Sequence, residues 1–289
     1  MSDSVEIFEV GPRDGLQNEA RLIPVAEKIA LVDLLGQAGF KRIEVASFVS
    51  PKWVPQMAQS GAVLAGIRRV PGVSYAALTP NLKGFQAAVA AGADEVAIFG
   101  SASEGFSRAN INASVAESLE RFGLVTEAAR QAGLVVRGYV SCAMDCPYDG
   151  PVAPEAVVRV VAALLEMGCY EVSVADTLGR ASPEAVDAML HAVTEAFGAA
   201  RLAAHFHDTG GGALENISVA LARGIRVFDA AVGGLGGCPY APGAKGNVAT
   251  EAVAAHLAAL GYETGLDRAV LAEAAQLARA MRLGDAKLL

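Results

Sequence analysis

Two histidines lie two positions apart, at residues 205 and 207, although the whole chain contains only four. They fall at the end of a β-rich run, Leu202–Phe206, and residues i and i+2 of a strand point to the same face. Both imidazoles can therefore face one point. With carboxylate and amide oxygens nearby, such a pair suits a divalent cation such as Mg²⁺, Mn²⁺ or Zn²⁺. The alternative is that two polar residues cap a layer of side chains.

Asp14 and Asn247 carry oxygens that complete such a donor set. Arg13 directly precedes Asp14, so one loop can offer a ligand to a metal and a cation to a substrate. A guanidinium is planar and stays charged, which suits an oxygen on which negative charge develops during a reaction. The alternative for this pair is a turn aspartate beside a surface arginine.

Two further carboxylates stand at the ends of expected strands. Glu44 is placed at the end of the second strand in an otherwise apolar run, where a carboxylate is costly unless a hydrogen bond or a cation accompanies it. Arg13 or the metal shell is a plausible partner. The same argument applies to Asp176, for which the alternative is an N-cap of the helix that follows Thr177.

Cys238 lies in the glycine-rich segment 233–246. Such a segment can be a flexible loop and nothing more, and its pattern is not a dinucleotide-binding fingerprint. A lone exposed cysteine on a glycine-hinged lid over the active-site rim nevertheless favours a catalytic role.

Short β-rich runs alternate with helical patterns along the chain, which predicts a parallel sheet with helices outside it. Eight such repeats favour closure into a (β/α)8 TIM barrel, with an open doubly wound sheet as the alternative. We expect a single domain over residues 1–289, with the barrel at about 5–265 and a C-terminal helix after it. The active site of such a barrel lies at the C-terminal ends of the strands. The strands are expected at Val5–Val10, Arg42–Ala46, Ser74–Leu78, Glu95–Phe99, Leu134–Val140, Glu171–Ala175, Leu202–Phe206 and Arg226–Ala230.

The composition excludes several classes of protein. Hydrophobic residues make up 53% of the chain, which is too many for a disordered one. The net charge is −8, and no basic stripe suggests a partner nucleic acid. The longest uncharged stretches are too short for a membrane span. The first residues show no basic and apolar leader pattern, so we expect a cytoplasmic location.

Five segments together resemble the 3-hydroxy-3-methylglutaryl-CoA lyases, a family of DRE-type TIM-barrel metallolyases. The resemblance extends over about residues 5–265, and its last segment is similar to the lyase signature around the loop cysteine. The segments are Val10–Glu19, Ser47–Met57, Leu78–Phe85, Arg137–Cys142 and Gly234–Tyr240.

The resemblance implies a role for each candidate residue. Asp14, His205, His207 and Asn247 would hold a divalent cation, Mg²⁺ or Mn²⁺. Arg13 would stabilise an enolate, and Cys238 on the lid would take part in proton transfer. The family uses the positions of Glu44, Asp176 and Glu251 for activity or for ordering the site. Positions near the acyl-CoA substrate match Asn110, Arg137 and Tyr139.

The reaction implied is a retro-aldol cleavage of the C2–C3 bond, which gives acetoacetate and the enolate of acetyl-CoA. His205 or a group near Asp14 would take the hydroxyl proton, and Cys238 or His205 would protonate the enolate carbon. Leucine or ketone-body chemistry follows from the family reaction alone. Barrels of this kind often dimerise, so a homodimer is expected.

Some positions depart from the family pattern. Gly210–Gly212 stand where an aromatic residue, a glycine and a glutamine are usual, and Ala20 replaces a common lysine. These departures motivate an alternative substrate, another 3-hydroxy-3-methylacyl-CoA such as citramalyl-CoA. A barrel that binds metal or acyl-CoA without turnover is a further alternative, although none of the expected ligands is lost.

Overall fold

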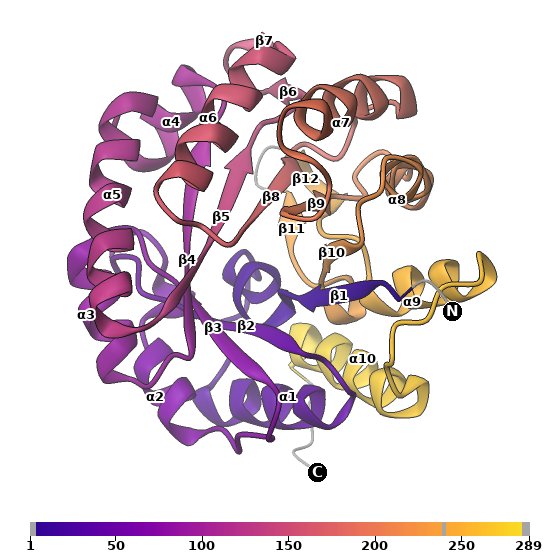
Figure 1. Cartoon of the computed structure of the whole chain (residues 1–289). Coiled ribbons are helices and arrows are strands. Elements are labelled where there is room, and N and C mark those ends of the chain that lie inside the picture. Colours follow the sequence, from indigo (N-terminus) through magenta and orange to yellow (C-terminus); the bar gives the residue numbers. More distant parts are fainter. Residues whose placement is uncertain (1–3, 239–240, 285–289) are drawn as a thin grey trace.

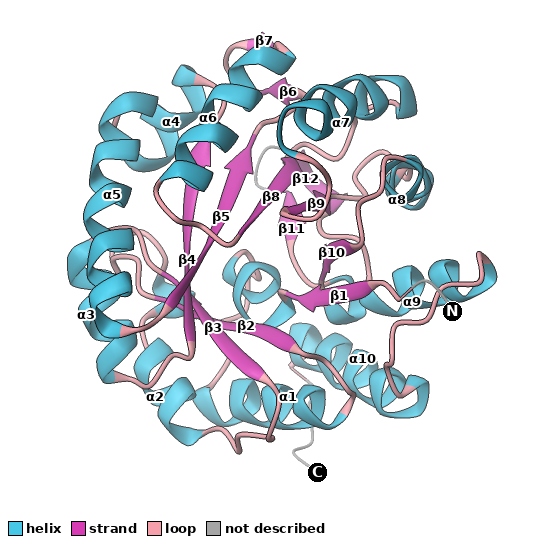
Figure 2. Ribbon diagram, viewed as in Figure 1, coloured by secondary structure: helices cyan, strands magenta, loops and turns pink. Residues whose placement is uncertain are grey.

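The computed structural model describes residues 4–238 and 241–284, and of residues 237–238 and 241–245 it describes only the backbone. Eight parallel strands form a closed barrel, in the order β1-β10-β9-β8-β5-β4-β3-β2. Helices surround these strands on the outside (Figures 1 and 2). The barrel strands are β1 (Glu6–Glu9), β2 (Arg42–Ser47), β3 (Ser74–Leu78), β4 (Glu95–Ser101), β5 (Val135–Ser141), β8 (Glu171–Asp176), β9 (Leu202–Phe206) and β10 (Val227–Ala230).

The barrel closes where β1 pairs with β10, with Phe8 opposite Asp229. Each predicted strand agrees with an observed one to within a few residues at either end, so the predicted (β/α)8 barrel is confirmed and the open sheet is excluded. The predicted position of Glu44 at the end of the second strand is wrong. Glu44 lies inside β2, because the strand continues to Ser47.

The helices that follow the strands are mostly those that the apolar periodicity predicts. Five glycines that follow these helices have positive φ angles, as helix-ending glycines commonly do (Gly39, Gly92, Gly133, Gly168 and Gly224). The outer helices are α1 (Val25–Gln37), α2 (Ser60–Gly66), α3 (Leu82–Ala90), α4 (Glu104–Ile111), α5 (Val115–Ala132), α6 (Pro154–Glu166), α7 (Pro183–Phe197), α8 (Ala213–Ala222), α9 (Thr250–Ala259) and α10 (Arg268–Leu283).

Shorter elements lie in the connections. A π-helical turn, η1 (Gly11–Gly15), follows β1, and 3-10 turns occur at η2 (Pro55–Met57) and η3 (Val232–Gly234). Two small antiparallel hairpins pair β6 (Asp145–Cys146) with β7 (Gly150–Pro151), and β11 (Gly237–Cys238) with β12 (Ala241–Lys245). Within the described ranges, no helix is long and apolar enough to cross a lipid bilayer.

The inside of the barrel is partly ionic rather than uniformly apolar. Arg137 on β5 has no exposed surface, and its guanidinium carbon lies 4.3 Å from the centre of the Phe8 ring and 4.9 Å from that of Tyr139. It pairs with Glu171 over 2.7 Å and with Asp229 over 2.8 Å. Because a buried charge is costly without a partner, these contacts compensate both carboxylates and the arginine.

Candidate active site

The π-helical turn after β1 presents Arg13 and Asp14 to the inside of the barrel mouth. The amides of Asp14 and Gly15 both donate to the carbonyl of Val10, over 2.8 and 3.2 Å. π-helical turns are rare and occur frequently at functional sites. The side chain of Arg13 is buried, and that of Asp14 is 19% exposed. The alternative of a turn aspartate beside a surface arginine is therefore wrong, because the arginine is not at the surface.

Arg13 is held by two carboxylates. Its Nε donates to Oε2 of Glu44 over 2.6 Å, and its Nη1 donates to Oδ1 of Asp14 over 2.6 Å. Nη2 lies 2.5 Å from the same oxygen of Glu44. A guanidinium has five N–H donors, so one remains on Nη1 and one on Nη2. The structure thus brings Glu44 to Arg13, the partner that the sequence suggested.

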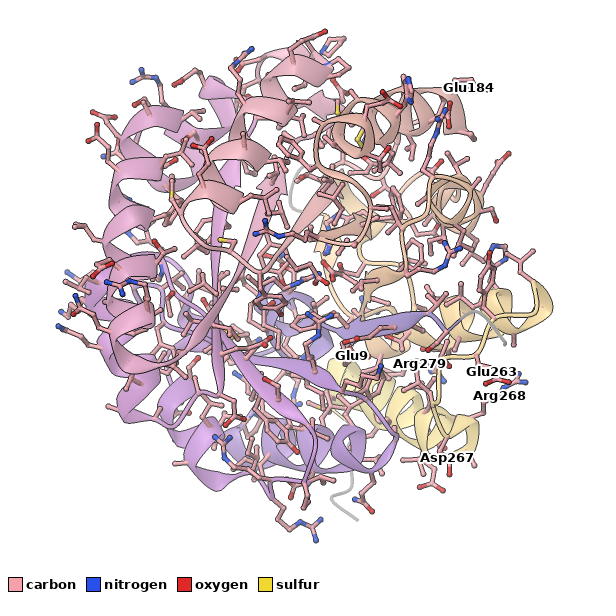
Figure 3. All side chains as sticks on the ribbon, in the orientation of Figure 1. Glu9, Glu184, Glu263, Asp267, Arg268 and Arg279 are labelled. Carbon is pink, nitrogen blue, oxygen red and sulfur yellow. The ribbon has the colours of Figure 1, made fainter. Side chains whose placement is uncertain are left out.

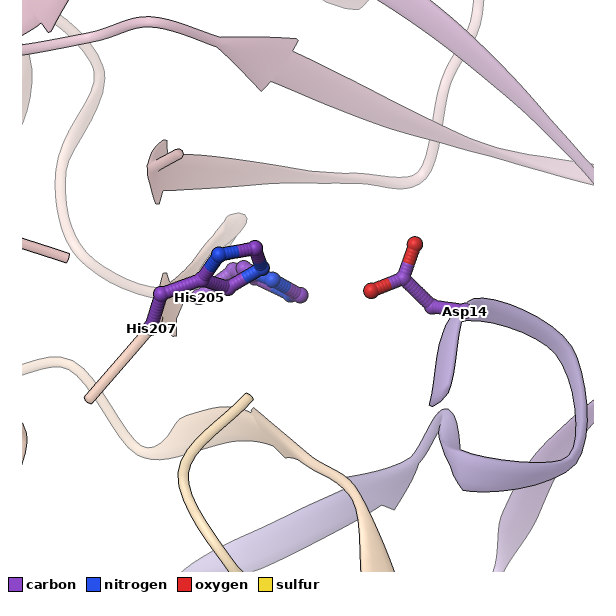
Figure 4. Close-up of side chains that lie close together, drawn as sticks. All are labelled: Asp14, His205 and His207. Atoms are coloured by element: carbon purple, nitrogen blue, oxygen red, sulfur yellow. The ribbon is translucent and has the colours of Figure 1, made fainter. Parts of the chain in front are cut away.

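His205 and His207 lie beside each other opposite the Asp14 carboxylate (Figure 4). Their ring centres are 5.2 Å apart, and ligand atoms of Asp14, His205 and His207 all lie within 4.8 Å of one another. His205 is the fourth residue of β9, and His207 follows that strand directly, paired in a β-bridge with Asn247. The two expected imidazoles therefore converge on the expected carboxylate.

Asn247 completes this group. Its Nδ2 donates to Oδ2 of Asp14 over 2.9 Å, which leaves its Oδ1 free to face a ligand. Oδ1 of Asn247 and Nδ1 of His207 are both buried and without a hydrogen-bond partner among the described residues. Buried polar atoms are rarely left unpaired. Two unpaired acceptors beside a carboxylate and a second imidazole fit a divalent cation with nitrogen and oxygen ligands.

The surroundings of the cluster keep Asp14 and His207 in the form that binds a cation. Burial by itself would raise the pKa of Asp14, but Arg13, the two histidines and the hydrogen bond from Asn247 together outweigh burial and lower that pKa to about 2. Burial, together with neighbouring His205, lowers the pKa of His207 to about 4. At neutral pH, Asp14 is therefore a carboxylate and His207 is an uncharged imidazole.

Asp176 orders the loop beside the cluster. It is buried at the end of β8, and its carboxylate accepts from the amides of Gly179 and Ala181, each over 3.0 Å. The alternative of an N-cap is wrong, because Ser182 caps α7 by accepting from the amide of Ala185. Burial raises the pKa of Asp176, while the loop amides oppose that shift.

The three residues expected near the acyl-CoA lie in different surroundings. The Tyr139 ring centre is 5.7 Å from the guanidinium carbon of Arg13, and its hydroxyl is buried without a partner among the described residues. Asn110 is exposed on α4. Arg137 has no exposed atom, so the geometry favours an indirect role through Asp229 over the direct contact that we expected.

Two buried carboxylates were not found from the sequence. Asp229 accepts from Arg137 and Ser173 and faces His205. Glu9, shown beside β1 in Figure 3, accepts from the amides of Gly11 and Val232 and from the hydroxyl of Thr250. Asp229 points into the barrel, on the same face as Phe8, which lies opposite it on β1. Glu9 points the other way, toward Thr250 on α9. Strand alternation could have placed Asp229 inside, but it gives no reason to expect a carboxylate between β1 and α9.

The remaining expected residues are Cys238, Glu251 and the glycines that follow His207. The backbone of Cys238 belongs to β11, but its side chain lies outside the described part of the structure. Glu251 accepts from the amide of Gly233 over 3.0 Å and pairs with Arg279 on α10. After His207, an added methyl group at Gly211 or Gly212 would meet open space, whereas one at Gly210 would lie 3.1 Å from the carbonyl of Gly179.

Comparison with known proteins agrees with this geometry. The HMGL-like family model matches residues 4–278. A Bos taurus protein named hydroxymethylglutaryl-CoA lyase, mitochondrial, is 56% identical over 93% of this chain and 83% of its own length. A Pseudomonas aeruginosa protein named 3-hydroxy-3-isohexenylglutaryl-CoA/hydroxy-methylglutaryl-CoA lyase is 58% identical over 94% of this chain and 91% of its own.

Solved structures of HMG-CoA lyases also resemble this chain. The HMG-CoA lyase of Brucella melitensis superposes with a TM-score of 0.97 at 58% identity, over 98% of this chain and 100% of that one. An HMG-CoA lyase from Acinetobacter baumannii, solved with coenzyme A and 3-methylmalate, has a TM-score of 0.92 at 38% identity, over 100% of this chain and 94% of that one. With a family match over nearly its whole length, the chain belongs to the HMGL-like family.

Proposed function

We propose that this protein is a carbon–carbon lyase that cleaves 3-hydroxy-3-methylglutaryl-CoA to acetoacetate and acetyl-CoA. The observation that carries the proposal is the adjacency of two functions on one turn: Asp14 faces the two histidines, while Arg13 keeps two free N–H donors beside it. The names of the relatives at 52–58% identity support the same substrate.

Asp14, His205, His207 and Asn247 would hold the divalent cation, which we propose is Mg²⁺ or Mn²⁺. When bound, such a cation acidifies a coordinated hydroxyl and polarises a carbonyl oxygen. The oxygen and imidazole donors support this choice, because thiolates, which favour softer metals, are absent from the described cluster.

Arg13 would act on the developing enolate. When the C2–C3 bond breaks, its electron pair moves to C2 and onto the thioester oxygen, and the free donors on Nη1 and Nη2 can stabilise that oxygen. Glu44 fixes the plane of the guanidinium through its contacts with Nε and Nη2. Asp176 positions the loop beside His207, and Asn110 and Tyr139 remain candidates for contacts with the acyl-CoA.

The sequence left both Cys238 and His205 as candidates for protonating the enolate carbon, and the contacts of His205 favour Cys238. Nδ1 of His205 faces Asp229, so only Nε2 can serve the cluster. One nitrogen cannot hold a cation and carry a proton at the same moment, which favours the ligand role for His205. We therefore propose that Cys238 protonates the enolate carbon. A Cys238→Ser variant should lower kcat with little change in Mn²⁺ affinity.

A turnover assay on metal-stripped protein tests the function. 3-Hydroxy-3-methylglutaryl-CoA and citramalyl-CoA are supplied separately, with and without Mg²⁺ or Mn²⁺, and acetyl-CoA and the keto acid are measured. We expect metal-dependent acetoacetate from the first substrate. Turnover of citramalyl-CoA alone would replace the substrate, and the open space at Gly211 and Gly212 is the observation that would explain it. No turnover of either would support the binding-only alternative.

Two properties of the whole protein are also proposed. We infer a homodimer, which light scattering on the purified protein would confirm or exclude. We infer a cytoplasmic location, supported by a Danio rerio relative named as cytoplasmic at 57% identity, and fractionation of the source cells would test it.

A further inference from the structure

Asp229 on β10 contacts His205, a proposed metal ligand, inside the barrel. Its Oδ2 lies 3.3 Å from Nδ1 of His205 and accepts from the hydroxyl of Ser173 over 2.8 Å. Its Oδ1 accepts from Nη2 of Arg137 over 2.8 Å. Asp229 has no exposed side-chain surface, and that of His205 is 8% exposed. The contact is therefore shielded from bulk water.

The partners of Asp229 decide which way its hydrogen bonds run. A guanidinium can only donate, so Oδ1 must accept from Arg137. An ionised carboxylate has no proton of its own, so Oδ2 also accepts. Nδ1 of His205 must then carry the proton of this contact. In a neutral imidazole only one nitrogen carries a proton, and Nε2 keeps its lone pair.

We propose that Asp229 is a positioning residue that holds the proton of His205 on Nδ1 and thereby keeps the Nε2 lone pair directed at Asp14 and His207. Metal-bound histidines commonly donate their second ring N–H to a carboxylate in this way. The inference deepens the proposed function, because it rests on the metal role assigned to His205. It gives Arg137 and Ser173 the task of holding Asp229 in place.

An Asp229→Asn substitution tests whether residue 229 sets the position of the proton on His205. The amide oxygen must face Arg137, because the opposite orientation would place an NH₂ group against a donor-only guanidinium. The NH₂ group then faces Ser173 and Nδ1 of His205. Nδ1 must accept instead of donate, so the proton moves to Nε2 and blocks the lone pair. The substitution keeps the size of the side chain and reverses one hydrogen bond.

The experiment uses metal-free protein labelled with ¹⁵N-histidine. Spectra recorded above the titration of the imidazoles distinguish a proton on Nδ1 from one on Nε2. The chain has four histidines, and a His205→Ala variant identifies the signal of interest. We expect Nδ1–H in the unsubstituted protein and Nε2–H in Asp229→Asn. Calorimetry should show that Asp229→Asn weakens Mn²⁺ binding by roughly 10- to 100-fold.

Glu171→Gln is the matched control. Glu171 is the other buried carboxylate on the same guanidinium, at 2.7 Å from Nε of Arg137, and no described contact joins it to His205. It should perturb folding stability about as much, yet leave Nδ1–H and the Mn²⁺ affinity of the unsubstituted protein. A purely structural role for Asp229 would make both variants alike in tautomer and affinity, and would overturn the inference.

The inference does not depend on one variant. If Asp229→Asn fails to fold, the unsubstituted protein still decides the matter, because a proton on Nε2 of His205 would overturn the proposal. Ser173→Ala removes one donor to Asp229 but no acceptor for His205, so it should retain Nδ1–H. Neither readout requires turnover. A protein with the expected tautomer and Mn²⁺ affinity but without lyase activity would refute the proposed function alone.

Discussion

Arg13 donates from Nε to Oε2 of Glu44 over 2.6 Å, although the two residues belong to different strand–loop units of the barrel. Glu44 has no exposed side-chain surface, so its charge is compensated inside the protein. Burial raises the pKa of Glu44, and the positive charge of Arg13 opposes that shift. The pair fixes the plane in which Arg13 presents its remaining donors.

Arg13→Lys should therefore abolish most of the activity. A lysine keeps the charge but cannot contact Glu44 and Asp14 and still offer two coplanar donors to an enolate. We expect kcat to fall on the order of 100- to 1,000-fold, as when one oxyanion donor is removed. Steady-state kinetics would measure this, with Mn²⁺ affinity by calorimetry as the control. Near-normal kcat in the lysine variant would show that charge alone suffices.

Asn247 offers a test of the metal site that does not use turnover. In Asn247→Asp, a second carboxylate would stand where Nδ2 now donates to Asp14 over 2.9 Å, so the metal-free protein should lose stability. A cation relieves this repulsion, and we expect Mn²⁺ to raise Tm more than it does in the unsubstituted protein. Asn247→Ala should respond less than either. Equal responses of the aspartate and alanine variants would place the cation elsewhere.

Much of this site could be predicted from the sequence, because its side chains lie at the C-terminal ends of strands, which meet at one rim of the barrel. The period-2 spacing predicts that His205 and His207 face the same point. The loop after β1 brings Asp14 to the same rim. Glu9 and Asp229 could not be predicted in the same way. The importance of Asp229 depends on which side chains meet inside the closed barrel, and closure is a property of all eight strands together. That of Glu9 depends on how α9 and the turn after β10 pack against the outer face of β1.

Glu9 predicts an unusual pH dependence of stability. Burial raises its pKa to about 7, against the three hydrogen bonds that it accepts, and the charge of Glu251 adds to the rise. The folded protein therefore binds a proton more tightly than the unfolded chain. The contribution to stability is complete below the unfolded pKa near 4.5 and is lost as the pH rises through about 7.

Glu9→Gln should remove this loss. The amide oxygen can accept from Gly11 and Val232, and the NH₂ group can donate to the hydroxyl of Thr250. We expect the variant to gain stability on the order of 3 kcal/mol at most at pH 8, and little at pH 4, since each pKa unit is worth about 1.4 kcal/mol. Urea unfolding at the two pH values would measure it. A variant destabilised more at pH 8 than at pH 4 would reverse the sign and refute the argument.

Arg137→Met should destabilise the fold strongly. The substitution leaves Glu171 and Asp229 as buried carboxylates without their shared cation, and breaking such a pair costs about 3–5 kcal/mol. Arg223→Met is the control, because Arg223 pairs with Asp187 over 2.6 Å at a partly exposed position. Exposed ion pairs are screened by water, so this substitution should cost much less. Equal losses in urea unfolding would mean that water reaches the Arg137 network.

Gly179 tests whether the loop ordered by Asp176 positions His207. A Cβ at residue 179 would lie 2.7 Å from Cβ of His207 and 2.8 Å from its backbone, so an alanine must push the histidine or its own loop away. Gly133 is the control, because its φ of 71° is close to the 64° of Gly179 and an added Cβ there meets nothing. Both alanines carry the strain of a left-handed backbone, about 1–2 kcal/mol. Only Gly179→Ala should also weaken Mn²⁺ binding, measured by calorimetry. Equal Mn²⁺ affinities in the two variants would show that the position of His207 does not depend on this loop.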